Sequence, residues 1–231
     1  MGTISGNGTG EGEAGVFGES ALFEGVRGMS FATFHGAVVG TNHNLSDQAG
    51  PGVFGLSERG VGVQGKGGVL AGLFQGNVEV TGDLMLTGGD VAEQFDIATQ
   101  SVSADETGPG TVVVLDGDGA LMPCARPYDT CVAGVVSRAG DRVPALVLDR
   151  QDRNVDGAMR LDIAVVGKVW CQADAASRAI QVGDLLTTSS RPGHAMAAVD
   201  REAAFGAVIG KALTPLASGT TGLVLALVGL G

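Results

Sequence analysis

The first part of the chain carries a short pattern of glycine and apolar positions that repeats. Gly-Val-x-Gly quartets stand at 15–18, 25–28, 52–55 and 62–65, with a looser copy at 37–40 and a stretched last one, GLFQG, at 72–76. Successive copies start ten to fifteen residues apart, which leaves room for one short strand and one turn but not for a helical repeat. The pattern therefore predicts repetitive β-structure over residues 1–76.

A single copy of this repeat buries too little apolar surface to fold alone. Each copy carries one Val-x pair, and its glycines add a backbone entropy cost to any strand. Three identical chains wound about one axis would complete one another's sheets and leave few free edges. We therefore expect a trimeric β-helix or β-prism shaft with glycines at its corners and five inward-facing valines: Val16, Val26, Val38, Val53 and Val63. A flexible glycine-rich linker is the alternative.

Residues 77–89, NVEVTGDLMLTGG, follow a different pattern. Four apolar residues alternate with other residues on either side of a Gly82-Asp83 turn: Val78, Val80, Leu84 and Leu86. Alternation with a period of two, broken by a Gly-Asp turn, predicts a pair of strands. We place this pair in a neck at the end of the shaft.

Residues 90–231 have the pattern of a compact β-domain, the head. Runs rich in β-branched residues and separated by turn-forming residues occur at 111–115, 132–136, 145–148, 161–171, 184–188, 205–213 and 222–229. Seven or more short strands predict an all-β, barrel- or sandwich-like domain. Glycine usage changes at the same boundary, since residues 1–89 hold 24 of the 40 glycines.

The negative charge of the chain restricts the kinds of partner that it can bind. The net charge is −11, only three lysines occur, and no basic cluster is present, which argues against nucleic acid and anionic membrane surfaces. The first residues have neither a basic nor an apolar signal-peptide region, so no secretory signal is expected. The longest apolar run, 222–231, is shorter than a membrane-spanning helix and is expected to form a buried terminal strand, without membrane insertion.

Few residues suggest metal or cofactor chemistry. The spacing of Cys124, Cys131 and Cys171 matches no zinc pattern, so reduced and buried cysteines are expected. DGDG at 116–119 predicts a hairpin turn, with a calcium loop as the alternative. A solvated acidic loop, with a cation site as the alternative, is predicted from three further residues: Asp149, Asp152 and Asp156.

Two further stretches match a functional motif by residue type but lack the surrounding sequence that the motif requires. The G-x-G-x-x-G sequences at 10–15 and 60–65 lack the preceding strand and following helix of a dinucleotide site. His194 stands near Ser189 and Ser190, but no nucleophile elbow surrounds either serine, so we expect a turn residue that packs or contacts a neighbouring chain. We expect no cofactor and no metal.

The quartets, the following GNVEVTGDL and the D-x-A-E-x-F motif in DVAEQF (90–95) resemble phage tail-fibre and appendage proteins and their relatives in contractile injection systems. TVVVLDGDG, VAGVVS, VVGKVWC and VGDLLTTSSRPGHAM resemble the C-terminal domain of the preneck appendage type, called the G2 peptidase or autoproteolytic chaperone domain. This resemblance implies a structural homotrimer whose end domain sets chain register. It also implies a baseplate or particle component, in a virion or extracellular injection particle assembled from cytoplasmic protein, and a cell-surface receptor as partner.

In some members of that family the end domain cuts itself off just before the Asp of D-x-A-E. Carried over, the resemblance implies a scissile Gly89–Asp90 bond with Asp90 and Glu93 as the catalytic pair. Two carboxylates held close do not both ionise easily, so one can donate a proton to the leaving amide while the other accepts one from water. The alternative is that both residues cap or salt-bridge the domain junction. A carbohydrate- or receptor-binding head is a third interpretation, although Trp170 and Tyr128 are the only Trp and Tyr that could form an aromatic platform.

Overall fold

The computed structural model describes residues 16–46, 49–97, 106–150 and 160–229. Contacts divide the chain into two units, Met1–Glu79 and Val80–Gly231, so the division falls inside the predicted neck. Within the described residues the structure has ten strands, all after residue 89, and no helix. The expected all-β fold is confirmed. None of the described segments is a helix that could cross a membrane.

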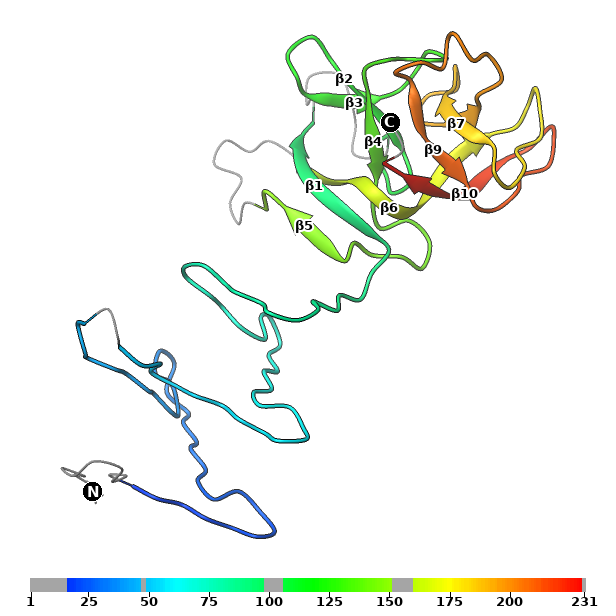
Figure 1. Ribbon diagram of the computed structural model, residues 1–231. Coiled ribbons are helices and arrows are strands. Elements are labelled where there is room, and N and C mark those ends of the chain that lie inside the picture. Colours follow the sequence, from blue (N-terminus) through cyan, green and yellow to red (C-terminus); the bar gives the residue numbers. More distant parts are fainter. Residues whose placement is uncertain (1–15, 47–48, 98–105, 151–159, 230–231) are drawn as a thin grey trace. The chain divides into compact units, whose positions relative to one another are not determined.

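The strands follow one another along the head (Figure 1). They are β1 (Asp90–Asp96), β2 (Val112–Leu115), β3 (Leu121–Pro123), β4 (Val132–Val136), β5 (Leu146–Leu148), β6 (Arg160–Asp174), β7 (Leu185–Thr188), β8 (Ala195–Ala197), β9 (Val208–Ala212) and β10 (Thr221–Val228). The seven predicted runs each contain one of these strands or most of it. The sequence patterns did not predict β1, β3 and β8.

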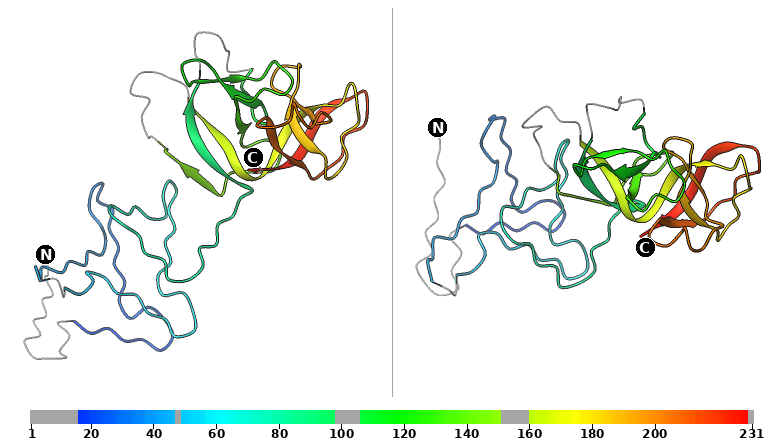
Figure 2. Two further views of the ribbon diagram at one scale, coloured as in Figure 1. Left: turned by 45° about the horizontal axis from the view of Figure 1, so that its top comes forward. Right: turned by 90° about the horizontal axis from the view of Figure 1, so that it is seen from above.

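The strands close into a barrel. The pairing runs β10-β9-β7-β8-β6, and β6 pairs again with β10, which completes the ring. β6 has 15 residues and pairs with two strands in succession: β1 pairs with residues 160–167 and β10 with residues 167–174. The views in Figure 2 show β6 curving through the head between these two strands. Outside this ring the sheet continues from β6 through β4 and β2 to β3.

The alternation of residues along these strands produces two apolar clusters. Since every second residue of a strand faces the same side, Val169, Cys171 and Ala173 of β6 point into the larger cluster, together with Val224, Ala226 and Val228 of β10. A smaller cluster joins β2, β4 and β6 and contains Ile97, Val113, Leu121, Val136 and Ile163. Ile97, the residue directly after β1, connects the end of β1 to this smaller cluster.

As a single chain, the glycine-rich unit lacks the β-structure that the sequence predicts for it. The five predicted core valines are 65–73% exposed, and the described residues between 16 and 89 form no strand. Among the described residues of this stretch, the only backbone–backbone hydrogen bond formed within it runs from the Ala49 N–H to the Ser46 carbonyl. The strand pair expected within 77–89 does not form in the single chain. A strand needs a second backbone to accept its hydrogen bonds, and no described segment supplies one there.

The glycines of the quartets mark close backbone approaches. A Cβ placed on Gly40 would lie 2.5 Å from the carbonyl oxygen of Gly52, and one on Gly55 would lie 2.8 Å from that of Gly62. In each case the last glycine of one quartet meets the first glycine of the next. The chain between two quartets therefore forms a loop whose ends touch, and the absence of a side chain allows this contact.

Candidate functional site

Asp90 is the first residue of β1 and is only 3% exposed. The Ser137 hydroxyl donates a 2.8 Å hydrogen bond to its Oδ2. Its other oxygen, Oδ1, is buried and has no hydrogen-bond partner among the described residues. Burial raises the pKa of Asp90 above the usual carboxyl range, and the Ser137 bond and the charge of Arg138 offset this effect only in part. A carboxyl that holds its proton unusually tightly therefore adjoins the predicted scissile bond.

The Gly89–Asp90 peptide bond is held on both sides by neighbouring backbone. The Lys168 N–H donates to the Gly89 carbonyl at 2.7 Å, and the Gly89 N–H donates to the Val143 carbonyl at 2.9 Å. The Asp90 carbonyl accepts from the Ala145 N–H at 2.7 Å. An N–H donor aimed at a carbonyl oxygen is the contact that stabilises negative charge when the carbonyl carbon is attacked.

Glu93, the predicted partner of Asp90, lies three residues further along β1. Residues separated by an odd number of positions in a strand face opposite sides, so the two side chains point away from each other. The register shift beside them skips Val165 of β6 and leaves β1 itself regular. The structure does not bring this carboxylate pair together within one chain. Its catalytic role stays a prediction.

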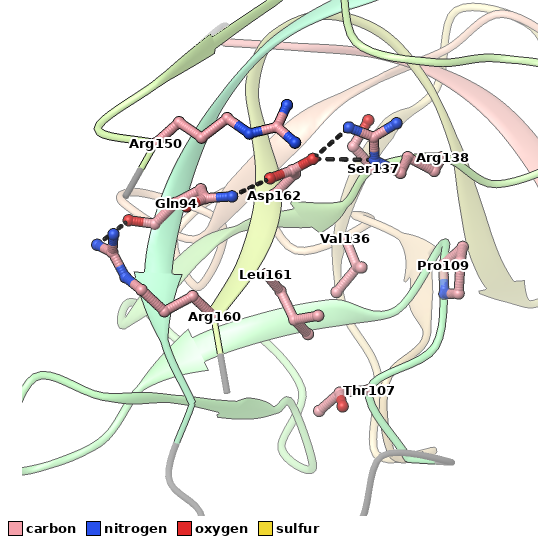
Figure 3. A pocket seen from close by; sticks show the side chains of 10 residues that line it. All are labelled: Gln94, Thr107, Pro109, Val136, Ser137, Arg138, Arg150, Arg160, Leu161 and Asp162. Carbon is pink, nitrogen blue, oxygen red and sulfur yellow. Dashed lines mark hydrogen bonds and ion pairs between the residues drawn. The ribbon is translucent and has the colours of Figure 1, made fainter. Parts of the chain in front are cut away.

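A pocket of about 440 Å³ is lined in part by Ser137, the hydrogen-bond partner of Asp90 (Figure 3). Its polar lining comprises Gln94, Thr107, Ser137, Arg138, Arg150, Arg160 and Asp162, and its apolar lining comprises Pro109, Val136 and Leu161. Ser137 connects the two features, because it lines the pocket and also binds Asp90. Three guanidinium groups therefore gather in one pocket of a chain whose net charge is −11.

Asp162 anchors one of these arginines. Arg138 donates to Asp162 Oδ2 from Nε at 2.9 Å and from Nη2 at 2.6 Å, while Gln94 donates to Oδ1 at 2.9 Å. Burial raises the pKa of Asp162, but these hydrogen bonds and the arginine charges outweigh it, so the pKa lies below the usual range. Arg138 has φ of +73°, a left-handed conformation that costs a non-glycine residue about 1–3 kcal/mol. Such strain is concentrated at functional sites.

The other two arginines differ from each other. Arg160 donates from all three of its guanidinium nitrogens, to the Asp96 carboxylate, to the Gln94 carbonyl and to both the carbonyl and the carboxylate of Asp149. Arg150 makes no hydrogen bond or ion pair with any described residue, although its charge contributes to the low pKa of Asp162. Figure 3 shows Arg138 and Arg150 extending toward Asp162 from two sides. Arg160 is thus held in place by its acceptors, and Arg150 is the one of the three arginines that pairs with no described residue.

The remaining candidates from the sequence lie elsewhere. DGDG forms the predicted turn between β2 and β3, where Asp116 Oδ1 accepts the N–H groups of Asp118 and Ala120. Asp149 pairs with Arg160, whereas Asp152 and Asp156 lie outside the described residues. No group of three or more metal-binding side chains occurs in the part of the chain that the structure describes.

The cysteines and His194 form no reactive pair. Cys124 and Cys171 are buried as expected, but Cys131 is exposed, since it lies at the edge of the head just before β4. The Ser189 hydroxyl bonds to Asp174, and His194 Nδ1 lies 2.7 Å from the Pro192 carbonyl, as suits a turn residue.

The D-x-A-E motif points to Asp90, but no local pattern points to Ser137, Arg138, Arg160 or Asp162. These residues come from the end of β4 and the start of β6, and strand pairing brings them together. One signal was available: five of the eleven arginines fall between positions 138 and 160 of an acidic chain. Comparison of the sequence with models of known families and with curated proteins finds no match.

Proposed function

We propose that this protein is a structural homotrimer of the tail-fibre or spike type, with residues 1–76 as its shaft and the barrel as its trimerisation head. One observation carries the proposal: residues 16–86 expose 25 large apolar side chains, yet they form recurring loops whose ends meet at glycines. A flexible linker would not need regularly spaced apolar residues or closed loops. A surface of this kind is typical of a chain that is completed by other chains.

The energetic argument supports association. Burying a large apolar side chain contributes about 1.5–3 kcal/mol, so 25 exposed ones leave tens of kcal/mol per chain available to an interface. The backbone of the same residues has unused donors and acceptors, which neighbouring strands would satisfy. Identical repeats on identical chains match one another, and a closed ring of three leaves no open edge. The number three follows the resemblance to fibre proteins.

The head would contribute register. Glycine-rich strands specify their pairing weakly, so three shaft chains could align in several ways. The head has a closed barrel and an apolar core that contains no shaft residue. Three heads in contact would raise the local concentration of the shaft segments and align their starting points. In a fibre, such a head can also contact a target surface.

Light scattering on the full chain tests the proposal. We expect a mass three times the 23.0 kDa of one chain. Hydrogen exchange on the same sample should then show protected amides in the shaft, because neighbouring chains would accept their hydrogen bonds. A monomeric mass, or free exchange throughout residues 16–86 of a trimer, would refute the shaft.

Self-cleavage at Gly89–Asp90 is the second candidate. The buried Asp90 with its unpartnered Oδ1 and the Lys168 N–H on the Gly89 carbonyl favour it. Water would add to the Gly89 carbonyl carbon, the C–N bond would break, and the Asp90 amine would take up a proton as Gly89 becomes a carboxylate. Because Glu93 faces the other side of β1, a pair with Asp90 would require the Glu93 of a second copy.

Intact-mass spectrometry of incubated protein decides this candidate. Cleavage would give fragments that end at residue 89 and begin at residue 90, and Asp90→Asn should abolish them. Loss of cleavage in Glu93→Gln, with the trimer unchanged, would support a pair formed between chains. Wild-type protein that stays intact at every pH would exclude self-cleavage and leave the structural role untouched.

A further inference from the structure

We propose that the pocket beside β1 binds the anionic group of a small organic molecule, a carboxylate or a phosphate ester, between Arg138 and Arg150. This inference concerns the head alone and does not depend on the shaft. It adds a ligand site to a protein whose proposed role is structural.

Among the described residues, one guanidinium group of the pocket has no carboxylate bonded to it. Arg160 is neutralised by Asp149 and Asp96, at 2.6 Å and 3.0 Å. Asp162 is matched by Arg138 at 2.6 Å. Arg150 remains, with no carboxylate among the described residues bonded to it. An unpaired guanidinium in a pocket of a strongly acidic protein attracts anions to that place rather than to the rest of the surface.

The second contact comes from Arg138. Asp162 binds its Nε and Nη2, while its Nη1 makes no hydrogen bond to a described residue. The side chain is 46% exposed, so Nη1 is accessible to a ligand. Because the ion pair with Asp162 already fixes the guanidinium, little side-chain entropy is lost on binding. A planar guanidinium suits the two oxygens of a carboxylate or phosphate.

The rest of the pocket determines the size and character of the ligand. Its volume of about 440 Å³ lies within the range of small-molecule sites. Val136, Leu161 and Pro109 offer an apolar surface to the body of the ligand. No aromatic side chain lines the pocket, so a neutral sugar would lack a stacking partner. A ring-sized molecule with one anionic group, such as a uronic acid or a sugar phosphate, fits this lining.

Isothermal titration calorimetry of the full-length protein tests the inference with three probes of similar size: glucuronate, glucose 6-phosphate and glucose. We expect binding of at least one anion, weakening as salt concentration rises, and no binding of glucose. Binding of glucuronate alone would assign a carboxylate site, binding of the phosphate alone a phosphate site, and binding of both a general oxyanion site. Each of these outcomes supports the proposal.

Variants locate the binding. Arg150→Gln should lower the affinity for the anion at least about tenfold, the usual effect of losing one charge-assisted hydrogen bond. Because Arg150 makes no hydrogen bond or ion pair with a described residue, the Arg150→Gln protein should have the melting temperature of the wild type. Arg178→Gln is the matched control, since Arg178 is exposed, is outside the pocket and approaches Asp184 only to 3.9 Å. The inference is overturned if neither anion binds wild type, if glucose binds equally well, or if Arg150→Gln binds like the Arg178 control.

Discussion

Replacing Gly40 by alanine tests the loops of the glycine-rich unit most directly. The added Cβ would lie 2.5 Å from the Gly52 carbonyl oxygen and 2.5 Å from Cγ2 of Val53. Ordinary contact begins at 3.4 Å, and the first obstacle is backbone that belongs to the next quartet. The loop must therefore open or shift, so the two quartets can no longer meet.

The size of the effect follows from this overlap. We take the cost of forcing one extra methyl group against this backbone as about 1–3 kcal/mol, the range for overpacking. A cost of that size raises the population of the opened loop about five- to 150-fold, and in a homotrimer every chain carries the substitution. Gly68→Ala is the control: its Cβ would meet nothing within 4 Å, and alanine there should be neutral or slightly stabilising.

Limited chymotrypsin digestion provides the assay, read as the rate of cleavage after Leu45, because Leu45 lies within the loop between Gly40 and Gly52, whereas the tryptic sites Arg27, Arg59 and Lys66 lie outside it. When opening is fast relative to cleavage, the cutting rate follows the population of the open form. Cleavage of Gly40→Ala should be faster than wild type by the factor above, and Gly68→Ala should match wild type. Equal rates for the two variants would show that the quartets do not meet as described.

Three further predictions concern the head. Asp90→Asn should raise the free energy of unfolding at neutral pH by about 1.4 kcal/mol for each unit by which burial raises the Asp90 pKa. The gain should vanish in acid, where Asp90 is protonated in both the folded and the unfolded wild-type protein. Denaturant titrations across pH measure this gain, and a gain that is the same at every pH would contradict the raised pKa. Leu186→Ala should cost about 2–5 kcal/mol in the same titrations because the side chain is fully buried, whereas Leu223→Ala, at a 43% exposed position, should cost clearly less. A maleimide should label Cys131 in the folded protein and leave the two buried thiols unmodified until it unfolds.

The strands that the sequence predicted are those whose own residues show a strand pattern. VAGVV at 132–136 and the run from 161 onwards combine β-branched residues with flanking turns, and both became strands. β3 and β8 have three residues each, too few to display a period, and only their neighbours define them. β1 was missed because Asp90 and Glu93 suggested a polar junction, whereas pairing with β6 buries Asp90.

The candidate site shows a different limit. Asp90 could be identified from a local motif, but its neighbours depend on long-range register. Ser137 donates its N–H to the Asp162 carbonyl and its hydroxyl to Asp90, contacts that join three segments far apart in sequence. Local patterns do not specify such register. The same limit applies to the pair of Asp90 and Glu93, whose spacing suggested proximity until the strand placed them on opposite sides.

The position of β1 between two strands has a mechanical consequence. Immediately after residue 89, β1 is bonded on one edge to β6 over seven residues and on the other to β5 over three. Hydrogen bonds between antiparallel strands run perpendicular to the strands, so a pull along β1 would load them together in shear rather than one after another. A chain that enters a domain in this way can transmit tension without peeling that domain apart, and the head would then act as a clamp on whatever force reaches it through the preceding segment.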